Sequence, residues 1–415
     1  EYLWSSGLWV GGIMLGERLV STGGLNSEFL PIPEDVNSTI YEAVDAKLVR
    51  PAGNPGASGR RKHMPDPDDD GDGLVDEETL NGKDDDGDGL VDEDFGQIGN
   101  QMFVHTNTDN TRLAMERYPD HTPMNLEVVQ TSFQWENDDV DDFVGFDFQV
   151  SNRGVTTIER VYVGFFSDSD IGPRGQGNTA NDDLAGSWPP DTPGSPGLVR
   201  ASDGSWVPLQ IGFMYDAAES GRLEGYFGIV FLGHDVDPTG RRAPTRVGMR
   251  TFQAFSGNAS FEQGGDPTND DQRYQLLSAE TEDWDRDTAR PADFRFLVSA
   301  GPFAELPPDE TLSFQVGMVV GPGLGDRAGG RGLLANAAEA WLTYEGIYLN
   351  EISQVQTRDG TIFDPGIYGR EAMLCMQDFD EGEFENFVPD YMDTSCIDAE
   401  WLLGQPRVSD ADIFE

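Results

Sequence analysis

The stretch LEVVQTSFQWENDDVDDFVGFDFQVSNRGVTTIERVYVGFFS, residues 126–167, decides the fold class. It contains three runs rich in Val, Phe and Tyr, at 126–135, 142–151 and 158–167, in which apolar and polar residues partly alternate. Turn-forming residues such as Asn-Asp-Asp at 137–139 separate these runs. Short runs of β-branched and aromatic residues between turn formers are typical of strands. The stretch therefore predicts consecutive β-strands.

The same pattern extends in both directions along the chain. Residues 1–50 carry short apolar pieces between Gly and Ser, which favours strands and turns. One helix is predicted at 332–344, because its Ala and Leu content favours helix and its apolar positions share one face. Long segments rich in Gly, Pro and Asp are expected to be loops, at 168–206 and 233–292. Further strands are predicted at 207–215, 225–232, 294–299 and 311–320.

These elements predict a mainly β, β-sandwich-like fold with long loops, a tandem calcium-loop insertion and one C-terminal α-helix. Four regions are expected along the chain. They are an N-terminal β segment at 1–50, a linker with the tandem loops at 51–97, the β-sandwich with its packing helix 332–344 at 98–346, and an extended C-terminal strap at 347–415.

Charge excludes several classes of partner. The chain of 415 residues has 76 Asp plus Glu against 27 Lys plus Arg, a net charge of −49. Such a surface repels nucleic acid, whose binding requires cationic groups that displace counterions from phosphates. The longest apolar run, residues 7–16, is interrupted by Gly and too short to cross a bilayer, so no membrane insertion is expected.

The acidic segment 66–94 contains a tandem repeat. The unit DDDGDGLVDE occurs at 68–77 and again at 84–93. In a calcium loop, side-chain oxygens at positions 1, 3 and 5, a Gly at 6, a backbone carbonyl at 7 and a ligand at 9 surround the ion. The predicted Ca²⁺ ligands at these positions are Asp68, Asp70, Asp72, Leu74 and Asp76 in the first loop, and Asp84, Asp86, Asp88, Leu90 and Asp92 in the second.

Position 12, usually a bidentate carboxylate, departs from this pattern. It is Thr79 in the first loop and Phe95 in the second, and we expect Glu78 and Asp94 to substitute from one residue earlier. A solvated acidic linker is the alternative reading of such a charge run. A linker, however, has no reason to repeat the Gly, Leu and Val positions in register. No flanking helices are signalled, so a structural role for calcium is favoured over a sensor role.

Further sites are weaker. Residues 66–94 hold 15 carboxylates against Lys83, which leaves the rest of the chain with −35 of the total −49. Additional cation ligands are expected among Asp168, Asp170, Asp182 and Asp183, and Asp235 with Asp237 forms a similar pair. Solvated loop carboxylates are the alternative for each of these groups. The two cysteines, Cys375 and Cys396, are predicted to form a disulfide, the alternative being two free thiols.

Catalytic signatures are sparse. The four histidines, His63, His105, His121 and His234, are scattered, and no HExxH, GxSxG, phosphate-binding or dinucleotide motif occurs. The expectation is therefore a non-enzyme. A hydrolase that uses paired carboxylates stays open as an alternative, because many such pairs exist. A glycan-stacking platform of Trp residues is another alternative, although core packing is the commoner role of Trp.

The calcium loops resemble those of dockerins and thrombospondin type-3 repeats. Together with LWVGGIMLGERLVS (8–21), MNLEVVQTSFQW (124–135), VYVGFFSDSDIG (161–172) and LSFQVGMVVG (312–321), they make most of residues 1–346 resemble a largely uncharacterised group of secreted bacterial surface proteins, with the calcium loops as the only specific motifs. Many of that group are exported by a type IX-like route. The resemblance implies an extracellular or cell-surface location and a β-sandwich, and it implies no enzymatic activity.

The combined interpretation is an extracellular, calcium-stabilised structural protein, a subunit of a cell-surface filament or other surface assembly. Self-association is expected, through the C-terminal tail or the N-terminal strand adding to a sheet of a neighbouring copy. Alternatives are a carbohydrate-binding or adhesin module with glycan partners, and a secreted hydrolase.

Overall fold

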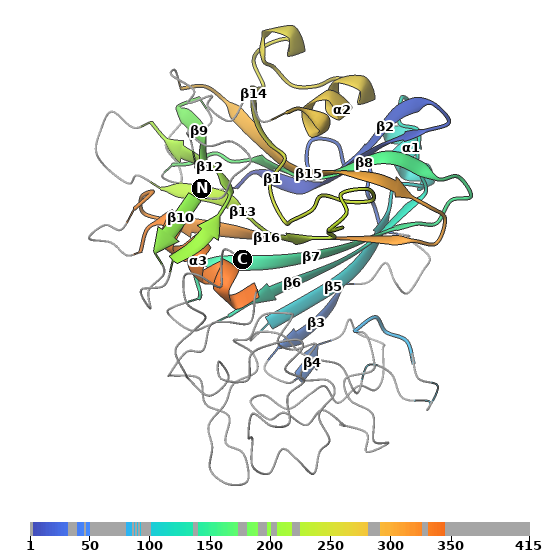
Figure 1. The fold of residues 1–415 in the computed structure, drawn as a ribbon, viewed down its shortest axis with the longest axis horizontal. Coiled ribbons are helices and arrows are strands. Elements are labelled where there is room, and N and C mark those ends of the chain that lie inside the picture. Colours follow the sequence, from blue (N-terminus) through green and yellow to red (C-terminus); the bar gives the residue numbers. More distant parts are fainter. Residues whose placement is uncertain are drawn as a thin grey trace.

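Two antiparallel sheets face each other and form a sandwich, which confirms the mainly β, β-sandwich-like prediction (Figure 1). The structure is a computed structural model. It describes residues 3–31, 40–44, 47–49, 80–84, 87, 89, 92, 101–135, 140–172, 181–189, 197–200, 206–217, 225–280, 291–325 and 331–344.

The smaller sheet has five strands in the order β14-β15-β8-β1-β2. Its neighbours all run antiparallel, and β8 is central because β1 and β15 pair with its two edges. The strands are β1 (Ser5–Met14), β2 (Glu17–Thr22), β8 (Ile158–Asp168), β14 (Thr251–Ser256) and β15 (Phe294–Leu306).

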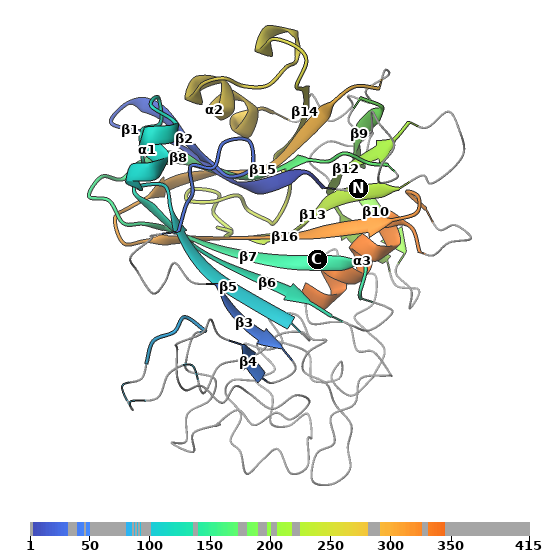
Figure 2. The ribbon, with the colours of Figure 1, turned by 180° about the vertical axis from the view of Figure 1, so that it is seen from behind.

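The larger sheet has nine strands in the order β4-β3-β5-β6-β7-β16-β13-β12-β9. Seen from behind, β5, β3 and β4 continue this sheet beyond the five-stranded one (Figure 2). The strands are β3 (Tyr41–Val44), β4 (Lys47–Val49), β5 (Gln101–Thr108), β6 (Leu126–Gln134), β7 (Phe143–Asn152), β9 (Asp183–Trp188), β12 (Ile211–Asp216), β13 (Tyr226–His234) and β16 (Thr311–Gly321); a separate two-stranded sheet pairs β10 (Gly197–Arg200) with β11 (Trp206–Leu209).

Alternation along the strands builds the main core between the sheets. In β8, Val161, Val163 and Phe165 face the interior of the sandwich, where Phe165 contacts Phe148 of β7 with ring centroids 5.7 Å apart. Tyr162 and Phe166, which alternate with these residues, point to the outer face of the sheet, where they belong to a second core with Trp9, Tyr274 and Leu277. Strands buried on both faces read as continuous apolar runs, which explains the sequence VYVGFF.

One helix covers the outer face of each sheet (Figure 1). On the five-stranded sheet lies α2 (Asp270–Ser278), where the Asn269 side chain accepts a hydrogen bond from the Gln272 amide and caps the helix. On the nine-stranded sheet lies α3 (Leu333–Tyr344), which confirms the helix predicted at 332–344. Two short helical segments complete the described elements, α1 (Arg112–Arg117) and η2 (Phe261–Gln263).

The close packing of α2 on the five-stranded sheet depends on a glycine in β8. A Cβ atom at Gly164 would lie 2.7 Å from Leu277 Cδ2 of α2 and 2.8 Å from the backbone oxygen of Val298. A backbone atom held in the sheet cannot rotate away, so we expect Gly164→Ala to lower the free energy of unfolding by about 1–3 kcal/mol. Urea unfolding measures this change.

A matched control for that substitution exists in β7. A Cβ atom at Gly145 would meet nothing closer than 3.6 Å, an ordinary contact. Gly145→Ala should therefore be near neutral. An equal cost for the two alanine variants would show that the close approach at Gly164 does not constrain α2.

The structure corrects three sequence-based expectations. The segments 168–206 and 233–292, expected as loops, contain the strands β9, β10 and β14 and the helix α2. The single strand expected at 207–215 is two strands, β11 and β12, which belong to different sheets and are separated at Gln210. The side chain of Gln210 accepts a hydrogen bond from the Met249 amide, which holds this break in place.

The third correction concerns the N-terminal strand. Strand β1 is hydrogen-bonded on one edge to β2 and on the other to β8 of the same chain. From Trp9 to Ile13 both edges of β1 are therefore occupied within the chain, so this part of the strand cannot also pair with a neighbouring copy. Among the described residues, no helix combines the length and apolar character needed to cross a lipid bilayer.

Candidate metal centre

The second predicted calcium loop is described at four of its positions. The carboxylate of Asp84, position 1, accepts hydrogen bonds from the amides of Gly87 (2.6 Å) and Gly89 (3.0 Å). Gly89, at position 6, has φ of +98°, a conformation that glycine adopts without strain. This is the position where a calcium loop needs a glycine for its sharp turn.

Position 9 of this loop faces the segment before it. The Asp92 carboxylate is fully buried and accepts hydrogen bonds from the amides of Asn81 (2.7 Å) and Gly82 (2.8 and 2.9 Å). Leu80, just before them, is 2% exposed and belongs to the core beneath α3 that also contains Tyr41 of β3. The loop is thus tied to the edge of the nine-stranded sheet.

The other predicted loop residues and the predicted disulfide lie outside the described residues. They are Asp68, Asp70, Asp72, Leu74, Asp76, Glu78, Asp86, Asp88, Leu90, Asp94, Cys375 and Cys396.

A second group of carboxylates gathers at one end of the sandwich. Asp168 is the last residue of β8, Asp170 follows it, and Asp293 directly precedes β15. Each of these three offers a carboxylate oxygen, and the three oxygens lie within 4.8 Å of one another. Since β8 and β15 are paired, with Asp168 opposite Arg295, the register of the sheet brings these residues together.

Arg295 partly neutralises this group. Its Nε lies 3.2 Å from Asp168 Oδ2, and its Nη1 lies 3.2 Å from Asp293 Oδ1. Asp266 Oδ1 lies 3.8 Å from the same guanidinium. Burial raises the pKa of Asp168 to about 6, against the lowering effect of Arg295, with Asp170 and Asp293 raising it further.

Asp183 joins this end from the opposite sheet. It is the first residue of β9 and is fully buried; its Oδ1 accepts a hydrogen bond from the Ile171 amide at 3.1 Å, and its backbone oxygen accepts one from Ala292. Burial is the main cause that raises its pKa to about 9, and the carboxylates of Asp170, Asp182 and Asp216 add to the effect. Among the described residues, the charged groups that act on Asp183 are thus all acidic.

All four further ligands predicted from the sequence, Asp168, Asp170, Asp182 and Asp183, thus lie at the same end of the sandwich. Sequence reasoning missed Asp293, which is separated from them by more than 100 residues. A signal for it exists, because Asp293 directly precedes a predicted strand just as Asp168 directly follows one.

The carboxylates of Asp235 and Asp237 already accept hydrogen bonds from other groups of the chain. Asp237 accepts hydrogen bonds from Thr239 and from the amides of Arg241 and Arg242, which lower its pKa to about 2. Asp235 Oδ2 accepts from the Ser313 amide at 3.1 Å. These contacts shape the loop that follows β13.

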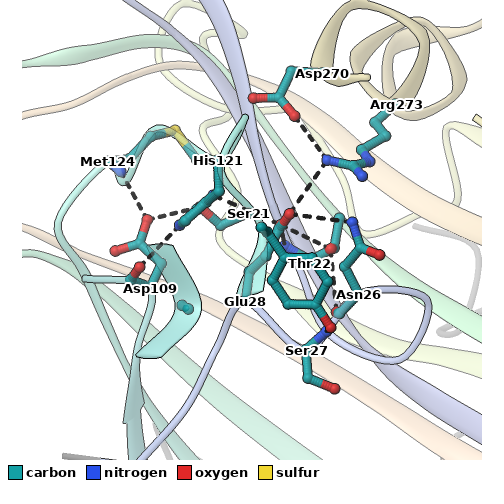
Figure 3. A network of polar contacts seen from close by, with 12 residues as sticks. Ser21, Thr22, Asn26, Ser27, Glu28, Asp109, His121, Met124, Asp270 and Arg273 are labelled. Atoms are coloured by element: carbon teal, nitrogen blue, oxygen red, sulfur yellow. Dashed lines mark hydrogen bonds and ion pairs between the residues drawn. The ribbon is translucent and has the colours of Figure 1, made fainter. Parts of the chain in front are cut away.

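A buried polar network, also missed from the sequence, lies at the far end of β2 (Figure 3). Glu28 is 1% exposed, and its Oε2 accepts hydrogen bonds from the amide and the hydroxyl of Thr22, both at 2.8 Å. Arg273 of α2, also buried, places one nitrogen 3.3 Å from Glu28 Oε1 and 2.9 Å from Asp270 Oδ1. The network joins α2 to the loop after β2.

Asp109 extends this network toward the nine-stranded sheet. Its carboxylate accepts hydrogen bonds from the Ser21 hydroxyl (2.7 Å) and from the amides of Met124 and Leu126 (both 2.8 Å), while burial raises its pKa. Nε2 of His121 lies 2.9 Å from the Asp109 carbonyl oxygen, which can only accept, so Nε2 carries a proton. A cleft of about 380 Å³ opens beside the network, with Glu28, His121 and Arg273 in its lining.

Tryptophan positions bear on the glycan alternative. Trp9 and Trp135 are buried in cores, whereas Trp4 is 71% exposed. Trp9 and Trp135 therefore have the core-packing role that is expected from the sequence for most tryptophans.

Comparisons with known proteins leave the family open. No protein-family model matches the chain, and no curated protein sequence matches it. The resemblance to secreted surface proteins with dockerin-like or thrombospondin-like loops therefore stays a prediction.

Proposed function

We propose that this protein is an extracellular, non-catalytic structural protein that calcium stabilises and that associates with further copies at the cell surface. The fold of the second loop is the observation on which the proposal rests. Asp84 at position 1 gathers the amides at positions 4 and 6, and Gly89 at position 6 turns with positive φ. Both features suit a loop that wraps a hard cation with oxygen ligands.

The attachment of the loop favours a structural role for the ion. A calcium sensor needs a pair of helices that can open when the ion binds. Here Leu80 is buried in a core, and a Cβ at Gly82 would lie within 3 Å of the Tyr41 ring, so the segment just before the loop packs tightly on β3, and Asp92 of the loop is hydrogen-bonded to that segment. An ion in this loop would hold the edge of the nine-stranded sheet rather than expose a new surface.

Association between copies is supported by the sheet edges. Strands β4 and β9 end the larger sheet, and β14 and β2 end the smaller one. An edge strand presents backbone groups that can pair with an added strand. We propose such pairing, with the C-terminal tail as the added segment, as the mode of assembly.

Removal of calcium tests the proposal. At a calcium concentration 100 times the Kd of a site, binding stabilises the folded state by about 2.7 kcal/mol per site, so chelation should lower the Tm by several degrees. Differential scanning calorimetry with calcium and with excess chelator measures this change. Negative-stain electron microscopy of the same samples shows whether assemblies dissolve when calcium is removed.

The variant Asp84→Asn assigns the effect to the loop. The amides of Gly87 and Gly89 bind different oxygens of Asp84, so the single amide oxygen of asparagine retains one of these hydrogen bonds while the ligand charge is lost. The Tm of this variant should respond to calcium less than that of the original chain. A melting temperature indifferent to calcium in the original chain would contradict the loop assignment, and a monomer in both conditions would contradict the assembly.

A further inference from the structure

We propose that the loop between β13 and β14 is a docking surface whose arginines bind carboxylates of a second copy of this chain. Residues 235–250 form this loop, the arginine loop, which carries Arg241, Arg242, Arg246 and Arg250. The inference rests on the proposed association between copies, and it names a surface through which that association would occur.

The arginine loop is a basic segment of a strongly acidic chain. Residues 238–261 include its four arginines and contain no Asp or Glu, although the chain has 76 such residues among its 415. Two copies that each carry a net charge of −49 repel one another, and only dissolved salt screens this repulsion. Contact between copies is therefore favoured where the local charge of one partner is positive.

Two guanidinium groups of the loop are available to a partner. Arg241 and Arg242 are exposed, and neither forms an ion pair with the residues that the structure describes. The exposed Arg112 and Arg153, by contrast, form ion pairs of 2.8 and 2.9 Å with glutamates of the same chain. A guanidinium presents its donors in a planar fork that matches a carboxylate, so Arg241 and Arg242 retain this capacity for a second molecule.

The two carboxylates nearest in sequence are hydrogen-bonded to backbone rather than to these guanidinium groups. Asp237 accepts from the amides of Arg241 (3.0 Å) and Arg242 (2.9 Å), and Asp235 accepts from the amide of Ser313. Both aspartates line a cleft of about 490 Å³ beside the first half of the loop. That side of the loop is therefore mixed in charge.

A separate cleft of about 430 Å³ beside the second half of the loop is basic. Arg246 and Arg250 contribute to its lining, in which Glu280 is the one acidic residue among those that the structure describes. The Arg250 guanidinium lies 5.4 Å from the centroid of the Tyr162 ring and donates hydrogen bonds to the backbone oxygen of Ser278, which fixes its position. Glu280 lies 3.9 Å from Arg250 and is 80% exposed, so it pairs weakly and a carboxylate of a partner can replace it.

The backbone of the arginine loop is held in place by the rest of the fold. The amide of Ala304 in β15 donates to the backbone oxygen of Arg242 at 2.7 Å, and the amide of Gly248 donates to Nε2 of His234 at 3.0 Å. A surface that is already ordered loses little backbone entropy when a partner binds. The loop therefore presents its arginines from a fixed position.

The position of the loop favours a head-to-tail contact. Arg242 is bonded to Ala304 near the end of β15, whereas Asp293 directly precedes that strand and lies beside Asp168 and Asp170. Basic and acidic groups thus lie at opposite ends of β15. Contact between two different surfaces of identical chains is heterologous, and such contacts generate rings or open filaments rather than twofold dimers. The arginine loop of one copy would thus face carboxylates on a different surface of the next copy.

Sedimentation velocity of the full chain, at about 20 mM and about 300 mM NaCl with calcium held constant, tests this surface. The loop variant combines Arg241→Gln, Arg242→Gln and Arg246→Gln. The control combines Arg112→Gln, Arg117→Gln and Arg153→Gln, three other exposed positions, so that the two variants have the same net charge. We expect the original chain and the control to associate at the lower salt concentration and to dissociate at the higher one. Association of the loop variant should be at least about 10-fold weaker.

The outcomes separate this surface from the proposed function. Equal weakening in the loop variant and the control would assign the effect to net charge and overturn the docking surface. Unchanged association in the loop variant would overturn the docking surface alone, whereas a monomeric original chain at the lower salt concentration would overturn the association between copies as well. If the loop variant does not fold, Arg241→Gln with Arg242→Gln, at positions without ion pairs among the described residues, gives the same comparison against Arg112→Gln with Arg153→Gln.

Discussion

Replacing Arg273 with methionine is expected to lower the free energy of unfolding by about 3–5 kcal/mol, the usual cost of removing one partner of a buried ion pair. Arg273 is 7% exposed, and its guanidinium contacts Glu28, which is 1% exposed, and Asp270. Methionine retains much of the apolar volume but removes the guanidinium that both carboxylates contact. Denaturant unfolding followed by circular dichroism measures the change.

Two controls locate the origin of this cost. In the double variant Glu28→Gln with Arg273→Met, one of the two orphaned charges is absent, so the double variant should be less destabilised than the sum of the two single variants. Arg112 forms an ion pair with Glu116 in which both side chains are more than half exposed, and Arg112→Ala should cost less than about 1 kcal/mol. A similar small cost for Arg273→Met would show that the Glu28 network is solvated and does not hold α2.

Replacing Phe148 with alanine is expected to cost about 3–5 kcal/mol, as usual for a buried phenylalanine. Phe148 of β7 is 1% exposed and lies among three other rings, Phe146 at 6.1 Å, Phe165 at 5.7 Å and Phe314 at 6.2 Å between centroids. Phe165 belongs to the opposite sheet, so the substitution opens a cavity where the two sheets meet. Urea unfolding of the purified variant measures it.

The matched controls are Phe148→Leu and Val155→Ala. Leucine fills part of the same space and should cost less than alanine does. Val155 is 97% exposed, so its truncation should change the free energy of unfolding by less than about 0.5 kcal/mol. A cost below about 1 kcal/mol for Phe148→Ala would contradict the packing of β7 against β8.

The fold class could be predicted from local pattern, because a strand buried on one or both faces requires apolar residues at fixed intervals. The runs at 126–135, 142–151 and 158–167 became β6, β7 and β8 within one or two residues at each end. The strands β9 and β14 were missed because short strands among Gly and Asp residues owe their pairing to neighbours far along the chain.

The candidate sites also differ in whether they could be predicted from local sequence. The predicted calcium loop is a local feature, so its repeat and its position-6 glycine could be recognised from the sequence, and Gly89 has a positive φ. At the acidic centre, Asp168 and Asp170 were anticipated, whereas Asp293 was not. Glu28 and Arg273 lie 245 positions apart, and no local signal connects them.

The sequence by itself determined the features that act over a few residues: strand and helix propensity, the periodic burial of Val163 and Phe165, the tandem loop repeat, and the strongly negative charge. Tertiary structure alone decided which strands share a sheet, how β8 and β15 bring Asp168 and Asp293 together, and how α2 places Arg273 beside Glu28. The physical reason is the sequence distance over which each kind of interaction acts. Propensity and alternation are set by each residue and its near neighbours, whereas ion pairs and metal ligand sets depend on distances that exist only after distant strands have paired.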